Sequence, residues 1–244
     1  MRAVCPETPL EILHADAALV AVMKPAGLLV HRTGLARDAD AFAVQRLRDQ
    51  LGRPVYPAHR LDRATSGVLL FALERDIHAR LAAAFESGAV DKRYLAIVRG
   101  WPPAALTIEH PLSRLDDEAE GPPRPATTRI VCLATAELDV RVDRYPTSRY
   151  ALVAAEPLTG RRHQLRRHLK HAGHPIVGDT TYGQGRHNRL FRERLGSSRL
   201  LLHALGLRLA HPVSGAPLEI RAEPPEDFAT VAAALGFAAA LAAR

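Results

Sequence analysis

The alternation of apolar and polar residues divides the chain into short strands and amphipathic helices. Segments 39–51 and 75–87 carry apolar residues at helical spacing, and Gly88 ends the second of them. "GVLLFAL" at 67–73 is an apolar run of strand length, and 92–100 alternates as a half-buried strand does. The same criteria predict strands at 10–14, 18–23, 127–135, 148–156, 200–209 and 217–222, and helices at 162–171 and 224–243.

The order of these elements predicts the fold class. Strands outnumber helices and do not alternate regularly with them, which favours an α+β fold with a central, mostly antiparallel mixed sheet and flanking helices. No repeat and no long linker is visible, so we expect one domain over 1–244. Segment 113–126 is acidic and then proline-rich, which is typical of a surface insertion.

Composition and charge narrow the class of partner. Lys and Arg outnumber Asp and Glu 33 to 26, and with only three lysines the excess is almost all arginine. A GC-rich genome would give the same bias, but guanidinium groups also bind phosphate, so a polyanionic partner is a serious candidate. Cys5 and Cys132 lie far apart in no ligand motif, and no signal or membrane segment is visible, which predicts a cytoplasmic protein.

"AHRLDRATSG" at 58–67 places one acid, Asp62, between Arg60 and Arg63. We expect a turn at 65–67 that leads into the apolar strand, and loops at the ends of a sheet often carry functional groups. A carboxylate held there suits attack on a sugar carbon or proton abstraction. A loop salt bridge of little energetic weight is the alternative interpretation.

"TGRRHQLRRHLKHAGHPIVGD" at 159–179 places five cations at the start of one short helix, where the helix dipole favours acids. Such a cluster requires anions, either nucleic-acid phosphates with one buried carboxylate, or the solvent around an exposed basic face. The four histidines of this segment have no Cys or acid at ligand spacing before Asp179, so we expect no metal. Tyr94, in the alternating strand, suits either half-buried core or stacking on a nucleobase.

Five stretches together resemble the RluA family of RNA pseudouridine synthases, over residues 9–222. They are "KPAGLLVH" at 24–31, "AHRLDRATSGVLLFAL" at 58–73, "KRYLAIVRG" at 92–100, "TGRRHQLRRHLKHAGHPIVGD" at 159–179 and "LLLHALGLRLAHP" at 200–212. The resemblance implies that a uridine of folded RNA is converted to pseudouridine in an RNA-binding cleft, with no cofactor. No N-terminal S4-type RNA-binding module is expected.

The resemblance also implies roles for single residues. Asp62 matches the catalytic Asp, which either attacks C1′ or removes the C2′ proton. Tyr94 matches the residue that stacks on the target uracil, and Arg166 matches the cation that pairs with the catalytic carboxylate. Arg60 matches the arginine that fills the gap left by the flipped uridine, and Leu201 or Leu202 the apolar wall beneath it, with Leu202 preferred. Further RNA contacts are expected from Arg161, Arg162, His163 and Arg167, whereas Arg63 receives no role.

Within the family, "RYPTSRYALV" at 144–153 and "HNRL" at 187–190 look most like a subgroup that modifies tRNA. The expected substrate is therefore tRNA at uridine 65, and the expected state is a monomer. A ribosomal RNA uridine is the nearest alternative, followed by a non-catalytic RNA-binding protein. A glycoside hydrolase is disfavoured, because it needs two carboxylates and no second acid accompanies Asp62.

Overall fold

The computed structural model describes residues 9–31, 42–115 and 121–243. The chain forms two compact units, one from Met1–Val90 with Gly206–Ala222 and the other from Asp91–Leu205 with Glu223–Arg244. We call them unit 1 and unit 2. Each unit has its own cluster of buried apolar side chains. Among the described residues, no helix combines the length and the apolar character needed to cross a membrane.

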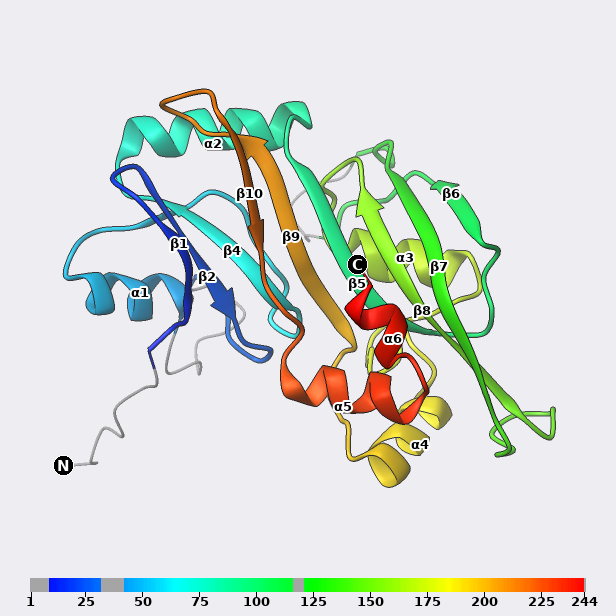
Figure 1. Cartoon of the computed structure of the whole chain (residues 1–244). Coiled ribbons are helices and arrows are strands. Elements are labelled where there is room, and N and C mark those ends of the chain that lie inside the picture. Colours follow the sequence, from blue (N-terminus) through cyan, green and yellow to red (C-terminus); the bar gives the residue numbers. More distant parts are fainter. Residues whose placement is uncertain (1–8, 32–41, 116–120, 244) are drawn as a thin grey trace. The chain divides into compact units, whose positions relative to one another are not determined.

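Unit 1 is a sheet with two helices (Figure 1). Strands β1, β2 and β4 are neighbours in antiparallel ladders, and β10 pairs with the end of β9. All seven residues of β4 are buried, which explains its continuous apolar run. The elements are β1 (Ile12–Ala15), β2 (Leu19–Lys24), α1 (Ala43–Leu51), β3 (Tyr56–Pro57), β4 (Ser66–Ala72), α2 (Arg75–Ser87), β9 (Leu202–Ala210, shared with unit 2) and β10 (Pro217–Arg221).

Unit 2 is built on four antiparallel strands in the order β5–β8–β7–β6, and Figure 1 shows the long β7 and β8 running side by side. Its core joins side chains of β5 and β8 to those of α4 and α5. The elements are β5 (Asp91–Arg99), β6 (Ala105–Glu109), β7 (Thr127–Leu138), β8 (Ser148–Pro157), α3 (Gln164–His171), α4 (Gly185–Leu195), α5 (Glu226–Ala234) and α6 (Ala238–Ala242).

The predicted fold class is confirmed, since helices flank sheets whose ladders within each unit are antiparallel where the register is defined. The helix expected at 39–51 begins at Ala43 in the structure, and 39–41 lie outside the described residues. Part of segment 113–126 also lies outside them, while the described residues 121–125 are exposed. The expectation of a single domain over 1–244 stays a prediction.

Three other predictions need correction. The expected C-terminal helix at 224–243 is two helices, because Gly236 adopts a left-handed conformation (φ 79°) between α5 and α6. The helix expected from 162 begins at Gln164, because His163 also has a positive φ of 55°. Strand β6 and helix α4 were not expected at all.

Candidate active site

The loop that carries Asp62 lies in unit 1, directly before β4. The carbonyl oxygen of Asp62 accepts a hydrogen bond from the Thr65 amide at 3.1 Å, which closes a turn. Asp62 is half-buried and Arg60 is exposed. The turn expected at 65–67 therefore lies earlier in the chain, because Gly67 already pairs with Lys24 in the β2–β4 ladder. Strand β4 begins at Ser66, so the sheet fixes the backbone directly after the turn.

Lys24 joins this loop to the turn after β2. Its ammonium group is fully buried and donates hydrogen bonds to the carbonyl oxygens of Pro25 (2.8 Å), Leu28 (2.8 Å) and Arg63 (3.2 Å). The Arg63 carbonyl also accepts from the Gly27 amide at 2.7 Å, and the Arg63 Nε donates to the Gly27 carbonyl at 3.0 Å. Two of the five sequence stretches, 24–31 and 58–73, are therefore held together next to Asp62.

Arg166 and Asp179 form a buried ion pair in unit 2. Arg166 Nε donates to Asp179 Oδ2 at 2.7 Å and Nη2 donates to Oδ1 at 2.9 Å, with side chains 9% and 0% exposed. Burial raises the pKa of Asp179, but the Arg166 contacts and the amides of Tyr182 and Thr181 outweigh it, so the pKa lies below its ordinary value. Asp179 is thus a buried carboxylate that offsets the basic helix.

Asn188 fixes the loop that presents Asp179. Its side-chain amide donates to the Asp179 carbonyl at 2.9 Å, and its Oδ1 accepts from the Gly178 amide at 2.8 Å. Gly178 has a φ of 81°, and a Cβ there would clash with the backbone of Arg199. The sequence analysis assigned no role to Lys24, Asp179 or Asn188. Their only signal was that each lies inside a stretch that resembles the family or its subgroup.

The start of α3 is organised by Gln164 rather than by a capping hydroxyl. Its Oε1 accepts from the Arg161 amide and the Thr159 hydroxyl, and its Nε2 donates to the Thr127 carbonyl and to Thr128 Oγ1. His163, in its left-handed conformation, lies 3.0 Å from the Tyr182 hydroxyl, and Arg166 lies over the same Tyr182 ring at 5.1 Å. Tyr182 thus touches two of the predicted site residues.

Other basic and imidazole groups of this region contact the protein itself. Arg161 donates to the Pro125 carbonyl at 3.1 Å and Arg167 to the Ser113 carbonyl at 2.8 Å. His168 is fully buried between Thr128 Oγ1 (2.9 Å) and the His110 carbonyl (3.0 Å), which makes it a core residue. In the described part of the chain, no group of three or more His, Cys, Asp or Glu residues could hold a metal ion.

The predicted site residues fall in both units. Asp62 and Arg60 lie in unit 1. The other predicted site residues lie in unit 2: Tyr94 on β5, Leu202 on β9, Arg166 and Arg167 in α3, and Arg161, Arg162 and His163 directly before α3. Tyr94 is half-buried on β5, Leu202 is buried at the start of β9, and Leu201 packs in the core of unit 2. The predicted pairing of Arg166 with Asp62 joins residues of different units and stays a prediction.

Comparison with known proteins shows the family to which this chain belongs. The family model described as RNA pseudouridylate synthase matches residues 18–171, and the chain belongs to that family. It is 48% identical over 235 residues to tRNA pseudouridine synthase C of Salmonella typhi, covering 93% of this chain and 90% of that protein. It is 50% identical over 212 residues to the enzyme of the same name from Pasteurella multocida, covering 84% and 87%.

Two human structures are similar over most of the chain. Human RNA Pseudouridylate Synthase Domain Containing 1 matches with a TM-score of 0.70 and 28% identity, covering 88% of this chain and 84% of that chain. Human RNA Pseudouridylate Synthase Domain Containing 4 matches with a TM-score of 0.71 and 27% identity, covering 93% of each. The chain is therefore an isomerase that converts uridine in RNA to pseudouridine, as the resemblance implied.

Proposed function

We propose that this chain converts uridine 65 of tRNA to pseudouridine in the cytoplasm. The observation that carries the proposal is the 48% identity to tRNA pseudouridine synthase C over 93% of the chain. The segments 144–153 and 187–190, which pointed to a tRNA-modifying subgroup, lie within the matched length. The net charge of +7 supports binding to a polyanion.

The reaction is an isomerisation. The bond between N1 of uracil and C1′ of ribose breaks, the base rotates, and C5 forms a bond to C1′. The proton lost from C5 is balanced by one gained at N1, so substrate and product contain the same atoms and no oxidant, reductant or group donor is consumed. The uridine must leave its stack to expose C1′, which costs a few kcal/mol.

We assign the chemistry at the ribose to Asp62. Its loop is fixed by the turn to Thr65 and by the contacts between Lys24, Gly27 and Arg63, so the backbone that carries the carboxylate is in place before substrate arrives. We assign stacking on the uracil to Tyr94, whose ring is half-buried on β5, and contact with the carboxylate to Arg166. Asp179 takes two of the five Arg166 N–H donors and sets the plane of the guanidinium.

The test is to incubate the protein with an unmodified tRNA transcript and with ribosomal RNA fragments. Pseudouridine is then mapped by carbodiimide modification and reverse-transcription stops. We expect one stop, at position 65 of tRNA, and none in the ribosomal fragments. A stop found only in ribosomal RNA would mean that ribosomal RNA, and not tRNA, is the substrate. Product in neither RNA would contradict the proposal.

The Asp62→Asn variant tests the catalytic assignment in the same assay. The amide cannot act as a nucleophile or base, so we expect the stop to disappear while tRNA binding in a filter assay stays within about threefold. Asp76→Asn, an exposed acid on α2, is the matched control and should retain full activity. If Asp62→Asn kept a turnover close to that of the control, the catalytic role would belong to another residue.

A further inference from the structure

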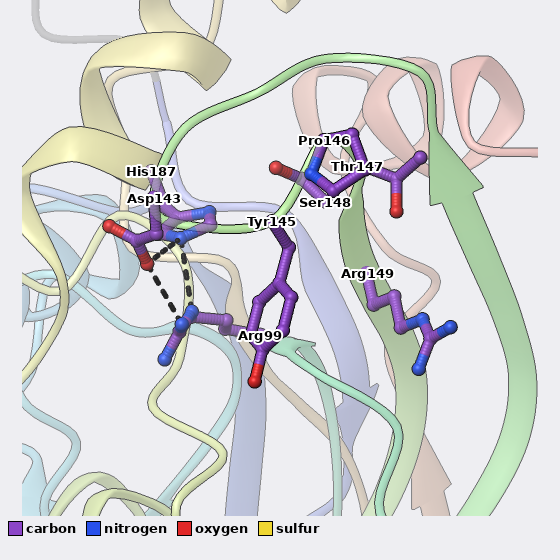
Figure 2. Close-up of a pocket in the computed structure, with 8 residues that line it drawn as sticks. All are labelled: Arg99, Asp143, Tyr145, Pro146, Thr147, Ser148, Arg149 and His187. Atoms are coloured by element: carbon purple, nitrogen blue, oxygen red, sulfur yellow. Dashed lines mark hydrogen bonds and ion pairs between the residues drawn. The ribbon is translucent and has the colours of Figure 1, made fainter.

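Unit 2 contains a pocket whose residues have no role in the proposed reaction (Figure 2). Its volume is about 480 Å³, within the range of pockets that bind small ligands. It lies where the last residue of β5, the loop that precedes β8 and the start of α4 meet. The lining residues are Arg99, Asp143, Tyr145, Pro146, Thr147, Ser148, Arg149 and His187. They come from the two segments whose sequence pointed to a tRNA-modifying subgroup, together with Arg99 and Asp143.

The floor of the pocket is a connected set of polar groups. Asp143 Oδ2 lies 2.8 Å from Arg99 Nη2 and 3.1 Å from His187 Nε2, as the dashed lines of Figure 2 show. The other nitrogen of His187 lies 2.7 Å from the hydroxyl of the buried Tyr150. Burial lowers the pKa of His187, so its imidazole is neutral at pH 7. The floor is therefore rigid and offers a guanidinium and a carboxylate side by side.

Aromatic rings and arginine side chains lie at and near the rim of the pocket. Tyr145 is 56% exposed, and in the view of Figure 2 its ring stands between the Arg99–Asp143–His187 cluster and Arg149. The Arg144 guanidinium lies 4.7 Å from the Tyr145 ring centre. The Arg149 guanidinium lies 4.2 Å from the ring of Trp101, which is 40% exposed. Exposed aromatic rings and guanidinium planes are surfaces on which a nucleobase can stack.

The pocket is distinct from the position of the target uracil. Tyr94 and Arg99 are five residues apart on β5, in a ladder whose register with β8 is regular between them. At about 3.3 Å per residue they are separated by about 17 Å along the strand. The odd spacing also places their side chains on opposite faces of the sheet. A base stacked on Tyr94 therefore cannot occupy this pocket.

We propose that the pocket binds an unpaired nucleotide of the RNA substrate, at a distance from the uridine that reacts. This inference rests on the proposed function, since it assigns a second contact to the same RNA. The base stacks on Tyr145, the Arg99–Asp143 floor supplies donors and an acceptor to its polar edge, and the phosphate meets Arg186. Arg186 is 78% exposed and only 3.6 Å from Asp143, a loose pair that a phosphate can replace.

The chemistry of the pocket favours RNA over other ligands. Proteins recognise unpaired nucleotides by stacking them on aromatic or guanidinium planes and by hydrogen bonds to base edges. The pocket has both, with the guanidinium groups of Arg99, Arg144, Arg149 and Arg186 around it against the carboxylates of Asp143 and Glu137. Folded tRNA exposes unpaired nucleotides in its loops, so a site of this kind would select a folded RNA rather than a plain duplex.

Binding of an unmodified tRNA transcript to Asp62→Asn protein tests the proposal, because this background leaves the RNA unchanged. Adding Tyr145→Leu removes the stacking ring, and we expect Kd to rise about 5- to 30-fold. Tyr145→Phe keeps the ring and should stay within about threefold of the starting protein. Arg186→Gln should lower the slope of log Kd against log salt by about 0.7, the value for one phosphate contact on a single strand.

The matched control is Arg208→Gln, which removes another exposed cation (66%) from an ion pair with Glu219 on unit 1. It should leave both Kd and the salt slope unchanged. Equal Kd values for Tyr145→Leu and Arg208→Gln, with circular dichroism showing both folded, would overturn the proposal. Pseudouridine mapping with the unaltered protein is scored separately. If tRNA is modified but Tyr145→Leu does not weaken binding, only the proposed nucleotide pocket is contradicted. If Tyr145→Leu weakens binding but no pseudouridine forms in tRNA, only the proposed reaction is contradicted.

Discussion

At the scale of single residues, the loop of Asp62 is held by backbone groups as much as by side chains. Arg63 received no role from the sequence, yet its carbonyl accepts two hydrogen bonds and its Nε donates a third. Two of these three hydrogen bonds are made with Gly27, whose φ of 89° is accessible mainly to glycine. Arg63, the neighbour of Asp62, therefore fixes the loop, and its charge is only part of what it contributes.

Replacing Lys24 tests how much this loop depends on one buried ammonium group. Lys24→Met would remove one hydrogen bond from each of three carbonyl oxygens, of which that of Arg63 keeps the Gly27 amide, at a cost of about 2–4 kcal/mol in the free energy of unfolding. Because the Asp62 loop would lose its anchor, we also expect kcat to fall at least about tenfold. Urea denaturation and tRNA turnover measure the two effects.

Lys92→Met is the control for this substitution, since Lys92 is partly buried and makes a single longer contact, 3.3 Å, to the Thr159 carbonyl. Lys92→Met should lower the free energy of unfolding by less than half as much as Lys24→Met does. If the two variants were equally stable, the carbonyl contacts of Lys24 would not hold the loop.

Asp179 provides the second prediction at this scale. Asp179→Asn would take from the buried Arg166 guanidinium the carboxylate that accepts two of its N–H groups, which costs about 3–5 kcal/mol of stability. Asp76→Asn breaks only an exposed, 3.9 Å pair and should change the urea midpoint little. A midpoint for Asp179→Asn that matches this control would mean that another group neutralises Arg166.

At the scale of elements, the strands were predictable wherever burial was continuous or strictly alternating. The expected strand at 67–73 corresponds to β4, which is buried on both faces, and the expected helix at 75–87 corresponds to α2, which buries Ile77 and Leu81 one turn apart. Strand β6 was missed because only Ile108 of its five residues is buried. Helix α4 was missed because it begins at a glycine and buries few apolar side chains among many arginines.

Helices α3 and α4 each bury a neutral histidine, and this predicts how stability depends on pH. Burial lowers the pKa of His168 and of His187 below the ordinary value of 6.5. The unfolded chain therefore binds more protons than the folded protein below about pH 6.5, and the free energy of unfolding falls as pH is lowered from 7 to 5. Urea denaturation at several pH values measures this loss.

His168→Gln separates the contribution of α3 from that of α4. Glutamine does not titrate, so the loss of stability between pH 7 and 5 should be smaller than in the unaltered protein, although stability at pH 7 is also reduced. The loss that remains belongs mainly to His187. If His168→Gln had the same pH dependence as the unaltered protein, His168 would not take up a proton on unfolding.

At the scale of the whole molecule, the sequence offered candidates for the chemistry but none for the contacts that support them. Asp62 and Tyr94 could be proposed as site residues because each stands in a short stretch that resembles the family. Asp179 and Asn188 are nine residues apart in the sequence. Asp179 accepts a hydrogen bond from the Arg166 side chain, and Asn188 donates one to the backbone carbonyl of Asp179. Periodicity carries no information on such contacts. The pocket near Arg99 was hidden for the same reason, because its residues come from three separate segments.

The basic charge of the molecule leads to a prediction about salt. Lys and Arg exceed Asp and Glu by seven, and most of the exposed ion pairs involve arginine. If at least four arginines meet phosphates of tRNA, log Kd should rise with log salt with a slope of about 3, so that a fourfold increase in salt weakens binding about 60-fold. Filter binding of Asp62→Asn protein to unmodified tRNA between 50 and 200 mM salt measures the slope.

The slope also distinguishes two ways in which the protein could recognise its RNA. Phosphate contacts release counterions and depend steeply on salt, whereas stacking on Tyr94 or Tyr145 does not. The Arg208→Gln control should have the slope of the starting protein, because Arg208 is paired with Glu219 on a strand outside the proposed RNA contacts. A slope near zero for the starting protein would mean that the excess of arginine does not face the RNA, and that stacking and base contacts supply nearly all of the affinity.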